Sequence, residues 1–512
     1  MAPALLAAGL VAAQGGWAAL CETQTWDEGC AVAAGYRAVV EGDRRILPEG
    51  PPLLGLMVTG PLLALGARLP PLPDGKLPEY LCHQYAQQFL YRWENPHRAI
   101  LLAARAMVLL LTLAAVVAVV VWAHSLHGGL AGWLAALLAG FEPNWIAHGH
   151  LAAWDGIATA TMTLAMAAGA AYALAPNRLR AGLVGVLTGL ALTAKHSALL
   201  LGPTLGLLFL LVALANRDAR RAVLGHAVLA AVAAVGVVGA AYGLRYDEYL
   251  VSVRSIYRLN DPNYESYLLG HFAKGPASPF YPLVALSAKT PLGFLPLAPL
   301  GLWAAIRGGR AALWVPPLAL VLLTVGAEAC NPYHLGIRHV LPAIPALIIL
   351  ASGAVRLGHA GIRWPRLVAV APIALAGLGA IETAARAPDY LSFFNVVAGG
   401  PENGIAILDD SNLDWGQDLE RLGELQRREG LPRMGLWYFG SADPIALGLD
   451  VRAIRPEEYL HPEPGTYYAV SLHYANRLRR VLGPEADWLH RQRPWRRVGR
   501  SILVYRFDAS GG

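Results

Sequence analysis

The chain has 512 residues, and 55% of them are hydrophobic. Lysine and arginine together number 41 against 35 acidic residues, which gives a net charge of only +6, and the mean hydropathy is +0.42. Because long stretches of Ala, Leu and Val carry few charges, the composition excludes a soluble globular protein and indicates a polytopic membrane protein. We expect no nucleic-acid partner.

Transmembrane helices are expected wherever roughly 20 consecutive residues are largely apolar. About eleven stretches meet this requirement before the pattern ends near residue 384. They lie at residues 2–20, 99–123, 129–147, 156–175, 181–197, 198–215, 222–243, 282–306, 312–329, 339–355 and 364–384. The predicted fold class is therefore a polytopic α-helical membrane domain over residues 1–384, followed by a soluble domain over 385–512.

One further apolar segment, "PPLLGLMVTGPLLALGARL" at residues 51–69, is long enough to span the membrane. If it crossed, the later basic loops would fall on the same side as a chain start that carries no Lys or Arg to hold it there. Its Pro and Gly content favours an interfacial or re-entrant helix. We therefore do not count it as a crossing.

Four short loops rich in Lys and Arg orient the predicted helices. Basic loops stay in the cytoplasm during insertion, and two predicted crossings separate each of these loops from the next. The loops are "NRLRAG" at 177–182, "NRDARR" at 216–221, "RGGR" at 307–310 and "RLGHAGIRWPR" at 356–366. This pattern predicts a cytoplasmic N-terminus and places segments 21–97, 244–281 and 330–338, and everything after 385, on the outer face.

Ionisable residues gather at the predicted outer face in four separate segments. Such groups cost several kcal/mol at membrane depth unless they are paired or functional, so their common depth indicates a site. In chain order they are Asp27 with Glu28, Asp155, Lys195 with His196, and Arg338 with His339. A carboxylate can accept a proton from an attacking hydroxyl or amine, and cations can stabilise a departing phosphate. Together they describe transfer of a group from a lipid phosphate.

Structural alternatives stand beside this interpretation for several residues. Asp155 can simply cap the N-terminus of a helix, and Lys195 can snorkel to the interface. Arg105 can be either a snorkelling residue at a helix end or a phosphate ligand. The spacing of His148, His150 and His334 suggests no persuasive set of metal ligands, so we expect no metal and no cofactor.

Several motifs resemble a known enzyme family. The stretches are "WDEGCAVAAGYRAVVEGDRRILPEGPPLLGLM", "FLYRWENPHRAILLAARAMVLL", "AHGHLAAWDGIAT", "LTAKHSALLL", "YHLGIRHVLPAIP" and "PDYLSFFNVVAGGPENGIAILDDSNLDWGQDLERL". In order and character they look like GT-C fold, family 39-like glycosyltransferases, the group of the protein O-mannosyltransferases and the aminoarabinose transferase of lipid A. The resemblance covers nearly the whole chain and is specific for the family but not for the substrate.

The resemblance implies an inverting transfer from a polyprenyl-phosphate sugar at the outer face of a bacterial inner membrane. The acceptor would be a protein, a lipid or a polysaccharide. Asp27 matches the family's catalytic base, with Glu28 as its neighbour and Asp155 as a second acidic site. From topology, the candidates for the donor phosphate are Lys195, His196, Arg338 and Arg105. One departure is Gly50, in "PEGPPLL", where relatives commonly carry His.

Two other classes of function stay open. A transporter or lipid flippase also carries buried charges along its substrate path, although this chain has no obvious internal repeat. A non-catalytic protein that binds polyprenyl lipids in the cell envelope is the second alternative. It would tolerate replacement of Asp27.

Residues 385–512 alternate between strand-like and helix-like segments, which predicts a small α/β domain on the outer face. "GIAILDD" is predicted as a strand, "WGQDLERLGELQRREG" as an amphipathic helix ending at Gly430, "RMGLWYFG" and "TYYAVSL" as strands, and "WRRVGRSILVYRF" as a hairpin. "DDSNLDWGQD" packs four Asp into ten residues. We favour a structural role for these carboxylates over a cation or acceptor site.

All four cysteines fall on the predicted outer side, where disulfides persist. Cys21 and Cys30 flank the acidic pair, and a bridge between them would constrain its loop. Spacing alone does not establish that pairing. Free, buried cysteines are the alternative.

Overall fold

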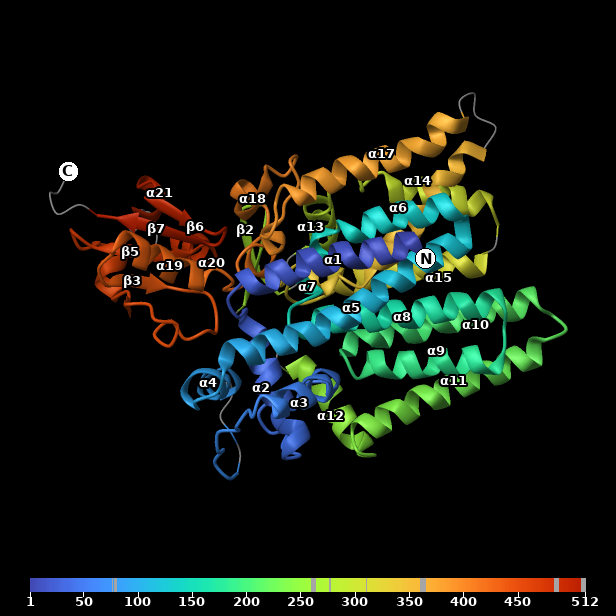
Figure 1. The fold of residues 1–512 in the computed structure, drawn as a ribbon, viewed down its shortest axis with the longest axis horizontal. Coiled ribbons are helices and arrows are strands. Elements are labelled where there is room, and N and C mark those ends of the chain that lie inside the picture. Colours follow the sequence, from blue (N-terminus) through green and yellow to red (C-terminus); the bar gives the residue numbers. More distant parts are fainter. Residues whose placement is uncertain are drawn as a thin grey trace.

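The computed structural model of the protein describes residues 1–75, 77, 81–258, 264–275, 278–309, 311–359, 365–482 and 488–507. Figure 1 shows two parts: a large helical body, in which many of the helices run side by side along the long axis, and a smaller sheet-containing part at one end. This architecture confirms the predicted class, a polytopic helical membrane protein with a small C-terminal α/β part.

Six helical segments among the described residues are long and apolar enough to cross a membrane. They are α1 (Ala2–Cys21), α5 (His97–His127), α8 (Trp154–Leu174), η2 with α10 (His196–Leu200 and Leu201–Ala215), α11 (Arg220–Ala241) and α15 (Ala311–Ala329). Helix α9 (Arg178–Leu192) packs between α8 and α11. Shorter apolar helices complete the body: α3 (Leu53–Ala64), α6 (Gly129–Gly140), α14 (Leu297–Arg307), α16 (Ala343–Ser352) and α17 (Pro365–Ala384).

The remaining described elements of the helical part lie at its connections. They are α2 (Trp26–Val40), α4 (Leu81–Gln87), η1 (Gln88–Arg92), α7 (Pro143–His148), α12 (Tyr246–Arg258), β1 (Glu265–Leu268), β2 (His271–Lys274), α13 (Tyr281–Lys289), η3 (Ile337–His339) and η4 (Gly353–His359). Strands β1 and β2 pair as an antiparallel hairpin.

The prediction of one continuous helix over 282–306 is wrong. Helix α13 ends at Lys289 and α14 begins at Leu297. Thr290 adopts an extended conformation (φ −96°, ψ 135°), because the ring of Pro291 disfavours the helical conformation in the residue before it. The predicted segment 129–147 is likewise divided between α6 and α7.

Segment 51–69 forms the short helix α3, which covers twelve residues. Such a helix is about 18 Å long, whereas the hydrocarbon core is about 30 Å thick. It packs on α2 at a point where a Cβ on Gly55 would lie 2.4 Å from the carbonyl oxygen of Gly35. Only glycine allows this close approach, which fixes α3 against α2.

The C-terminal part contains a five-stranded mixed sheet in the order β4-β3-β5-β7-β6. The strands are β3 (Met434–Trp437), β4 (Val451–Ala453), β5 (Tyr467–Ser471), β6 (Arg496–Val498) and β7 (Ile502–Arg506). Helices α18 (Gly400–Asn403), α19 (Leu419–Glu429), α20 (Leu472–Leu482) and α21 (Trp488–Arg491) accompany them, with the short turns η5 (Tyr390–Ser392), η6 (Gly404–Ala406), η7 (Asp410–Asn412) and η8 (Pro456–Tyr459).

Most predicted elements of this part are confirmed. Helix α19 ends at Gly430, which takes the left-handed conformation (φ +60°) that favours glycine after a helix. The predicted strands around Leu436 and Val470 and the β6–β7 hairpin also form. The strand predicted for "GIAILDD" is wrong: residues 404–406 form a 3-10 turn, and Leu408 makes only an isolated bridge with Leu268.

The connections that carry basic residues lie at one end of the helical part. In Figure 1 the turns between α8 and α9 and between α10 and α11 lie at the end remote from the C-terminal part. The beginning of α1 points toward that same end. This arrangement agrees with the common side predicted for these loops, and the side itself stays a prediction.

Candidate functional site

The acidic residue Asp27 lies in the first turn of α2, where a capping box begins the helix. The backbone N–H of Thr25 donates to Glu28 Oε2 at 2.9 Å, and the Thr25 hydroxyl donates to the same oxygen. This local pairing fixes the helix start. Asp27 is thereby presented to Arg338, whose Nη1 donates to Asp27 Oδ2 at 2.6 Å.

Two further contacts extend this ion pair into a connected cluster. Arg338 Nη1 also lies 3.6 Å from Asp155 Oδ2, and Lys195 Nζ donates to Asp155 Oδ1 at 2.5 Å. Asp155 is 2% exposed at its side chain, whereas Asp27 is 20% and Lys195 25% exposed. We call Asp27, Arg338, Asp155 and Lys195 the ion-pair cluster. It is buried at its centre and accessible at both ends.

Arg338 is held by a separate network on its own segment. The carboxylate of Glu328, in α15, lies 3.0 Å from His334 Nδ1 and 3.0 Å from His339 Nδ1. The backbone N–H of Ile337 donates to Asn412 Oδ1 of the C-terminal part at 2.9 Å. Anchored on both sides, η3 presents the guanidinium of Arg338 to the two carboxylates.

Burial and opposite charge stabilise the protonated form of Arg338. Desolvation alone would lower the pKa of the guanidinium, but Asp27 and Asp155 outweigh it, and the pKa is raised above its ordinary value. Arg338 therefore stays a cation that is available to an anionic ligand at any working pH.

Glu28 and Arg105 form a buried pair apart from this cluster. Arg105 Nε donates to Glu28 Oε1 at 2.8 Å and Nη2 donates to Oε2 at 2.7 Å. The other guanidinium hydrogens are donated to the carbonyl oxygens of Ala19, Glu22 and Thr23. All five N–H groups of Arg105 are thus used within the protein, which leaves none for a phosphate.

Glu28 also accepts a hydrogen bond from the backbone N–H of Ala152 at 2.9 Å. Burial would raise the pKa of Glu28, but the charge and hydrogen bonds of Arg105 outweigh it and hold the pKa below its usual value. The Glu28–Arg105 pair therefore joins the start of α2 to α5 and to the segment before α8. It positions Asp27 and Asp155 and contacts neither.

The remaining predicted phosphate candidate, His196, contacts residues outside the ion-pair cluster. Its Nε2 lies 2.8 Å from Ser252 Oγ, and Ser252 donates to the carbonyl oxygen of Glu49. The neighbouring Lys195 pairs with Asp155 and does not snorkel. Asp155 occupies the first turn of α8, where its carboxylate interacts favourably with the positive end of the helix dipole. Stabilising the start of this helix is compatible with membership of the ion-pair cluster.

Trp415 is a member of the site that the sequence analysis missed. Arg338 Cζ lies 4.7 Å from the centre of its ring, a cation–π contact. The carbonyl oxygen of Trp415 accepts from the backbone N–H of Trp26 at 2.9 Å. Trp415 belongs to "DDSNLDWGQD", and no local pattern there signals that it reaches a residue of the helical part.

The four Asp of that segment are bound by protein groups. Asp409 Oδ1 lies 3.0 Å from His473 Nδ1, Asp410 accepts from the Tyr264 hydroxyl at 2.5 Å, Asp414 accepts from the backbone N–H of His473 and Asp418 accepts from the Ser501 hydroxyl. These contacts support the structural interpretation of the segment. Their effect is to hold Trp415 in place.

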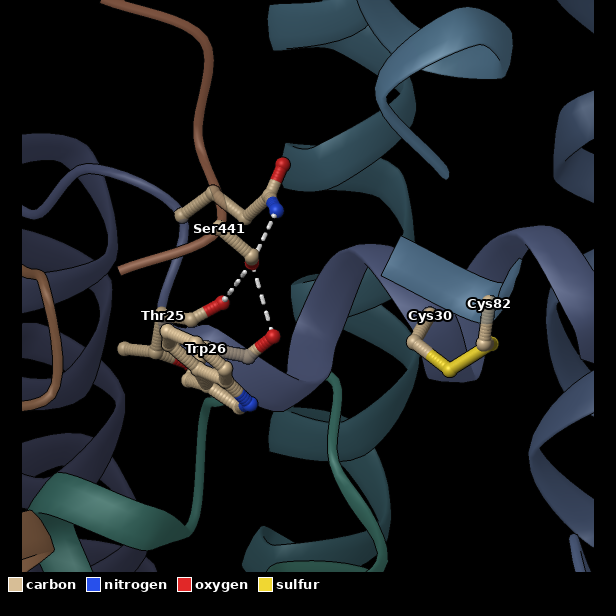
Figure 2. The surroundings of a disulfide bond; sticks show 6 residues. Thr25, Trp26, Cys30, Cys82 and Ser441 are labelled. Carbon is tan, nitrogen blue, oxygen red and sulfur yellow. Dashed lines mark hydrogen bonds between the residues drawn. A yellow bond between two sulfur atoms is a disulfide. The ribbon is translucent and has the colours of Figure 1, made fainter. Parts of the chain in front are cut away.

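Figure 2 shows the disulfide beside the site. The bond joins Cys30 of α2 to Cys82 of α4, and Cys21 is free. The Cys21–Cys30 pairing that the sequence left open does not form, because Cys21 lies in the last turn of α1 whereas α4 packs on α2 and brings Cys82 within reach. In the same view Ser441 of the C-terminal part donates to the carbonyl oxygen of Trp26 at 2.7 Å.

The histidines considered as metal ligands have separate surroundings. His150 Nε2 lies 3.0 Å from Glu22, His334 pairs with Glu328, and the ring of His148 packs edge-on against Trp415. Among the described residues, no group of three or more His, Cys, Asp or Glu side chains is arranged to hold a metal ion.

Comparisons with known proteins give likeness of fold only. No family model matches the chain, and no curated protein matches it. A solved structure of ArnT from Cupriavidus metallidurans bound to undecaprenyl phosphate is similar over 99% of both chains, with 15% identity and a TM-score of 0.49. The apo form of the same protein matches over 97% of this chain and 96% of that one, with 14% identity and a TM-score of 0.49.

An oligosaccharyltransferase from Archaeoglobus fulgidus, in the apo form, matches over 93% of this chain and 70% of its own, with 10% identity and a TM-score of 0.49. At these identities the likeness concerns the overall fold, and the function must be sought in the residues of this chain.

Proposed function

We propose that the protein is a GT-C type membrane glycosyltransferase that transfers a sugar from a polyprenyl-phosphate donor to an acceptor at the outer face. The observation that carries this proposal is the ion-pair cluster, in which two carboxylates and two cations from four distant segments form one connected group. Its charges are those that a displacement at a phosphate-bearing carbon requires. The family resemblance of the motifs supports the same reaction.

In this proposal Arg338 and Lys195 bind the donor phosphate while the lipid tail lies between helices. Both groups are cations that reach Asp155 from opposite sides, so the buried carboxylate holds them near one another. A phosphate oxygen placed between them accepts charge-assisted hydrogen bonds, which are among the strongest in proteins. The negative charge that develops on the leaving phosphate is stabilised by the same groups.

Asp27 is the proposed general base. A hydroxyl or amine of the acceptor gives its proton to the Asp27 carboxylate as its oxygen or nitrogen forms a bond to the anomeric carbon. The bond between that carbon and the phosphate oxygen breaks, and the electron pair leaves with the phosphate toward Arg338 and Lys195. Attack from the side opposite the phosphate inverts the anomeric configuration.

The Asp27–Arg338 contact gives this reaction an order. Arg338 Nη1 donates to Asp27 Oδ2 at 2.6 Å, so this carboxylate oxygen is occupied while the pair is intact. A donor phosphate that engages Arg338 competes for the guanidinium and leaves Asp27 freer to accept a proton. The donor is therefore expected to bind before the acceptor reacts.

The test uses purified protein in proteoliposomes supplied with a panel of radiolabelled polyprenyl-phosphate sugars and an envelope extract as acceptor. We compare the wild type with Asp27→Asn and with the control Asp450→Asn, which alters an Asp that is 70% exposed at its side chain in the C-terminal part. Label transferred to protein, lipid or polysaccharide by the wild type and the control, but not by Asp27→Asn, supports the proposal. Equal transfer by all three rejects Asp27 as the base. Movement of the labelled lipid across the bilayer without transfer favours a transporter.

A further inference from the structure

We infer that His148 is a third residue that contacts the donor phosphate, beside Arg338 and Lys195; this inference rests on the function proposed above. His148 ends the short helix α7 and is 2% exposed. Its Nδ1 atom is buried and finds no hydrogen-bond partner among the described residues. Buried polar groups are nearly always hydrogen-bonded, so this nitrogen points to a polar ligand.

The position of His148 is fixed on two sides by groups of the site. Its ring packs edge-on against Trp415, with ring centres 5.7 Å apart and an angle of 60°. A Cβ on Gly156 would lie 2.1 Å from the His148 carbonyl oxygen, so the backbone of His148 touches the residue that follows Asp155. The imidazole therefore lies near the buried centre of the ion-pair cluster.

Arg338 carries a second unsatisfied group in the same place. Its Cζ lies 4.7 Å from the centre of the Trp415 ring, and its Nε is buried without a hydrogen-bond partner among the described residues. Arg338 Nε and His148 Nδ1 are therefore two buried nitrogens without a partner among the described residues, and both belong to side chains that contact the Trp415 ring. A phosphate oxygen that accepts from the guanidinium edge and from the imidazole would satisfy both.

The charge state of His148 suits this role. Burial lowers its pKa to about 3, and the nearby charges of Asp155 and Arg338 act on it in opposite directions. The ring is therefore neutral at physiological pH and can donate one N–H without repelling Arg338. A neutral donor also differs from Lys195 in that it fixes the direction of a phosphate oxygen without adding charge.

His150, two residues further on, provides an internal comparison. It is equally buried, but its Nδ1 lies 2.9 Å from the Ile146 carbonyl oxygen and its Nε2 lies 3.0 Å from Glu22 Oε2. Both nitrogens are thus used by the protein, which is the usual state of a structural histidine. In contrast to Nδ1 of His150, Nδ1 of His148 has no hydrogen-bond partner among the described residues.

The test measures binding of undecaprenyl phosphate, and of undecaprenol as the phosphate-free reference, to the full chain in lipid nanodiscs. The variants are His148→Phe, which keeps a ring but removes the donor, His148→Gln, which keeps a donor, and His150→Phe as the matched control. The thermal midpoint of each variant is recorded without ligand. Losing one hydrogen bond to a charged group is expected to weaken phosphate binding about tenfold or more.

We expect His148→Phe to lose at least about tenfold in affinity for undecaprenyl phosphate with no change for undecaprenol, while His148→Gln stays close to the wild type. His150→Phe should lower the thermal midpoint and leave the phosphate preference of the folded protein intact. Wild-type affinity in His148→Phe, or equal losses in the Phe and Gln variants, overturns the inference. A wild type that binds undecaprenol as tightly as undecaprenyl phosphate instead overturns the proposed donor.

Discussion

At the scale of single residues, neighbours in the sequence divide between two tasks. Asp27 pairs with Arg338, 311 positions away, whereas Glu28 pairs with Arg105, 77 positions away. The adjacent positions point to different partners because successive side chains of a helix are about 100° apart. The acidic pair thus joins a carboxylate of the ion-pair cluster to the residue that anchors it.

Replacing Arg338 with Lys should weaken the donor site although the charge is kept. Lysine lacks the planar guanidinium group, which offers several hydrogen-bond donors and, in Arg338, contacts the Trp415 ring. We expect donor affinity to fall about tenfold, which corresponds to the loss of one charge-assisted hydrogen bond, and transfer to fall with it. Binding and initial-rate measurements check this. Unchanged affinity in Arg338→Lys would show that only the charge matters there.

Replacing Glu28 with Gln should destabilise the fold. Both side chains of the Glu28–Arg105 pair are at most 1% exposed, and removing one partner of a buried pair costs about 3–5 kcal/mol. The control is Glu429→Gln, which breaks a contact with the 72%-exposed Arg428 and should cost less than about 1 kcal/mol. Thermal midpoints in detergent provide the measurement, and equal shifts for both variants would contradict the assignment.

At the scale of elements, the disulfide and the α2–α3 contact hold the first outer segment together. Cys30 and Cys82 are 52 positions apart, and α3 is pressed on α2 through Gly35 and Gly55. The bond therefore closes a loop that contains α3 and begins just after the acidic pair. It restricts the segment that carries Asp27.

Replacing Cys82 with Ser should lower stability by about 4 kcal/mol, the loop-entropy value for a closed loop of this length. Cys21→Ser changes a cysteine that is free and should leave the thermal midpoint within a degree or so of the wild type. A reductant should then lower the midpoint of the wild type but not of Cys82→Ser. A reductant effect that is equal in the two proteins would place the sensitivity elsewhere.

The segment that holds Trp415 should be sensitive to pH. Burial raises the pKa of Asp414 to about 7, above the value of about 3.9 for an unfolded chain. The folded state therefore binds the proton more tightly, and this contribution to stability is full below about pH 4, declines as the pH rises and is gone above about pH 7. We expect Asp414→Asn to gain thermal stability relative to the wild type between pH 5 and pH 8. A difference that does not change with pH would show that this carboxyl does not titrate in that range.

At the scale of the whole molecule, the site lies where the helical part meets the C-terminal part. Trp26 stacks on Phe439 with ring centres 5.0 Å apart, and the backbone N–H of Thr23 donates to the carbonyl oxygen of Gln417. With the Ser441 contacts shown in Figure 2, these interactions fix the C-terminal part against the start of α2.

The sidedness of the chain can be tested with single cysteines in a background in which Cys21 and Cys330 are replaced by Ser. Val397, which is 80% exposed in the segment after α17, should react with an impermeant maleimide in intact cells when it is replaced by Cys. Asp218, exposed in the basic loop between α10 and α11, should react as Cys only after permeabilisation. Reaction of both positions in intact cells would contradict the predicted topology.

Local sequence patterns were enough for the elements that depend on local physics. Apolar stretches of membrane length predicted α1, α5, α8 and α11 within a few residues, and Gly430 marked the end of α19. The same patterns wrongly predicted one continuous helix over 282–306, because a hydropathy profile does not show that the helix breaks at Thr290 and Pro291. The strand predicted at "GIAILDD" failed because the buried carboxylates there hydrogen-bond to distant groups.

The sequence by itself determined the class of the protein and supplied a set of candidates that includes the four members of the ion-pair cluster, together with Glu28, Arg105 and His196, which lie outside it. Composition and helix length set the class, because the cost of placing charge in lipid acts on each residue separately. Only the tertiary structure decided the partners. It separated Glu28 and Arg105 from the site, joined Cys30 to Cys82 and brought Trp415 and His148 beside Arg338. These contacts link positions at least 52 residues apart, and local periodicity carries no record of such distances.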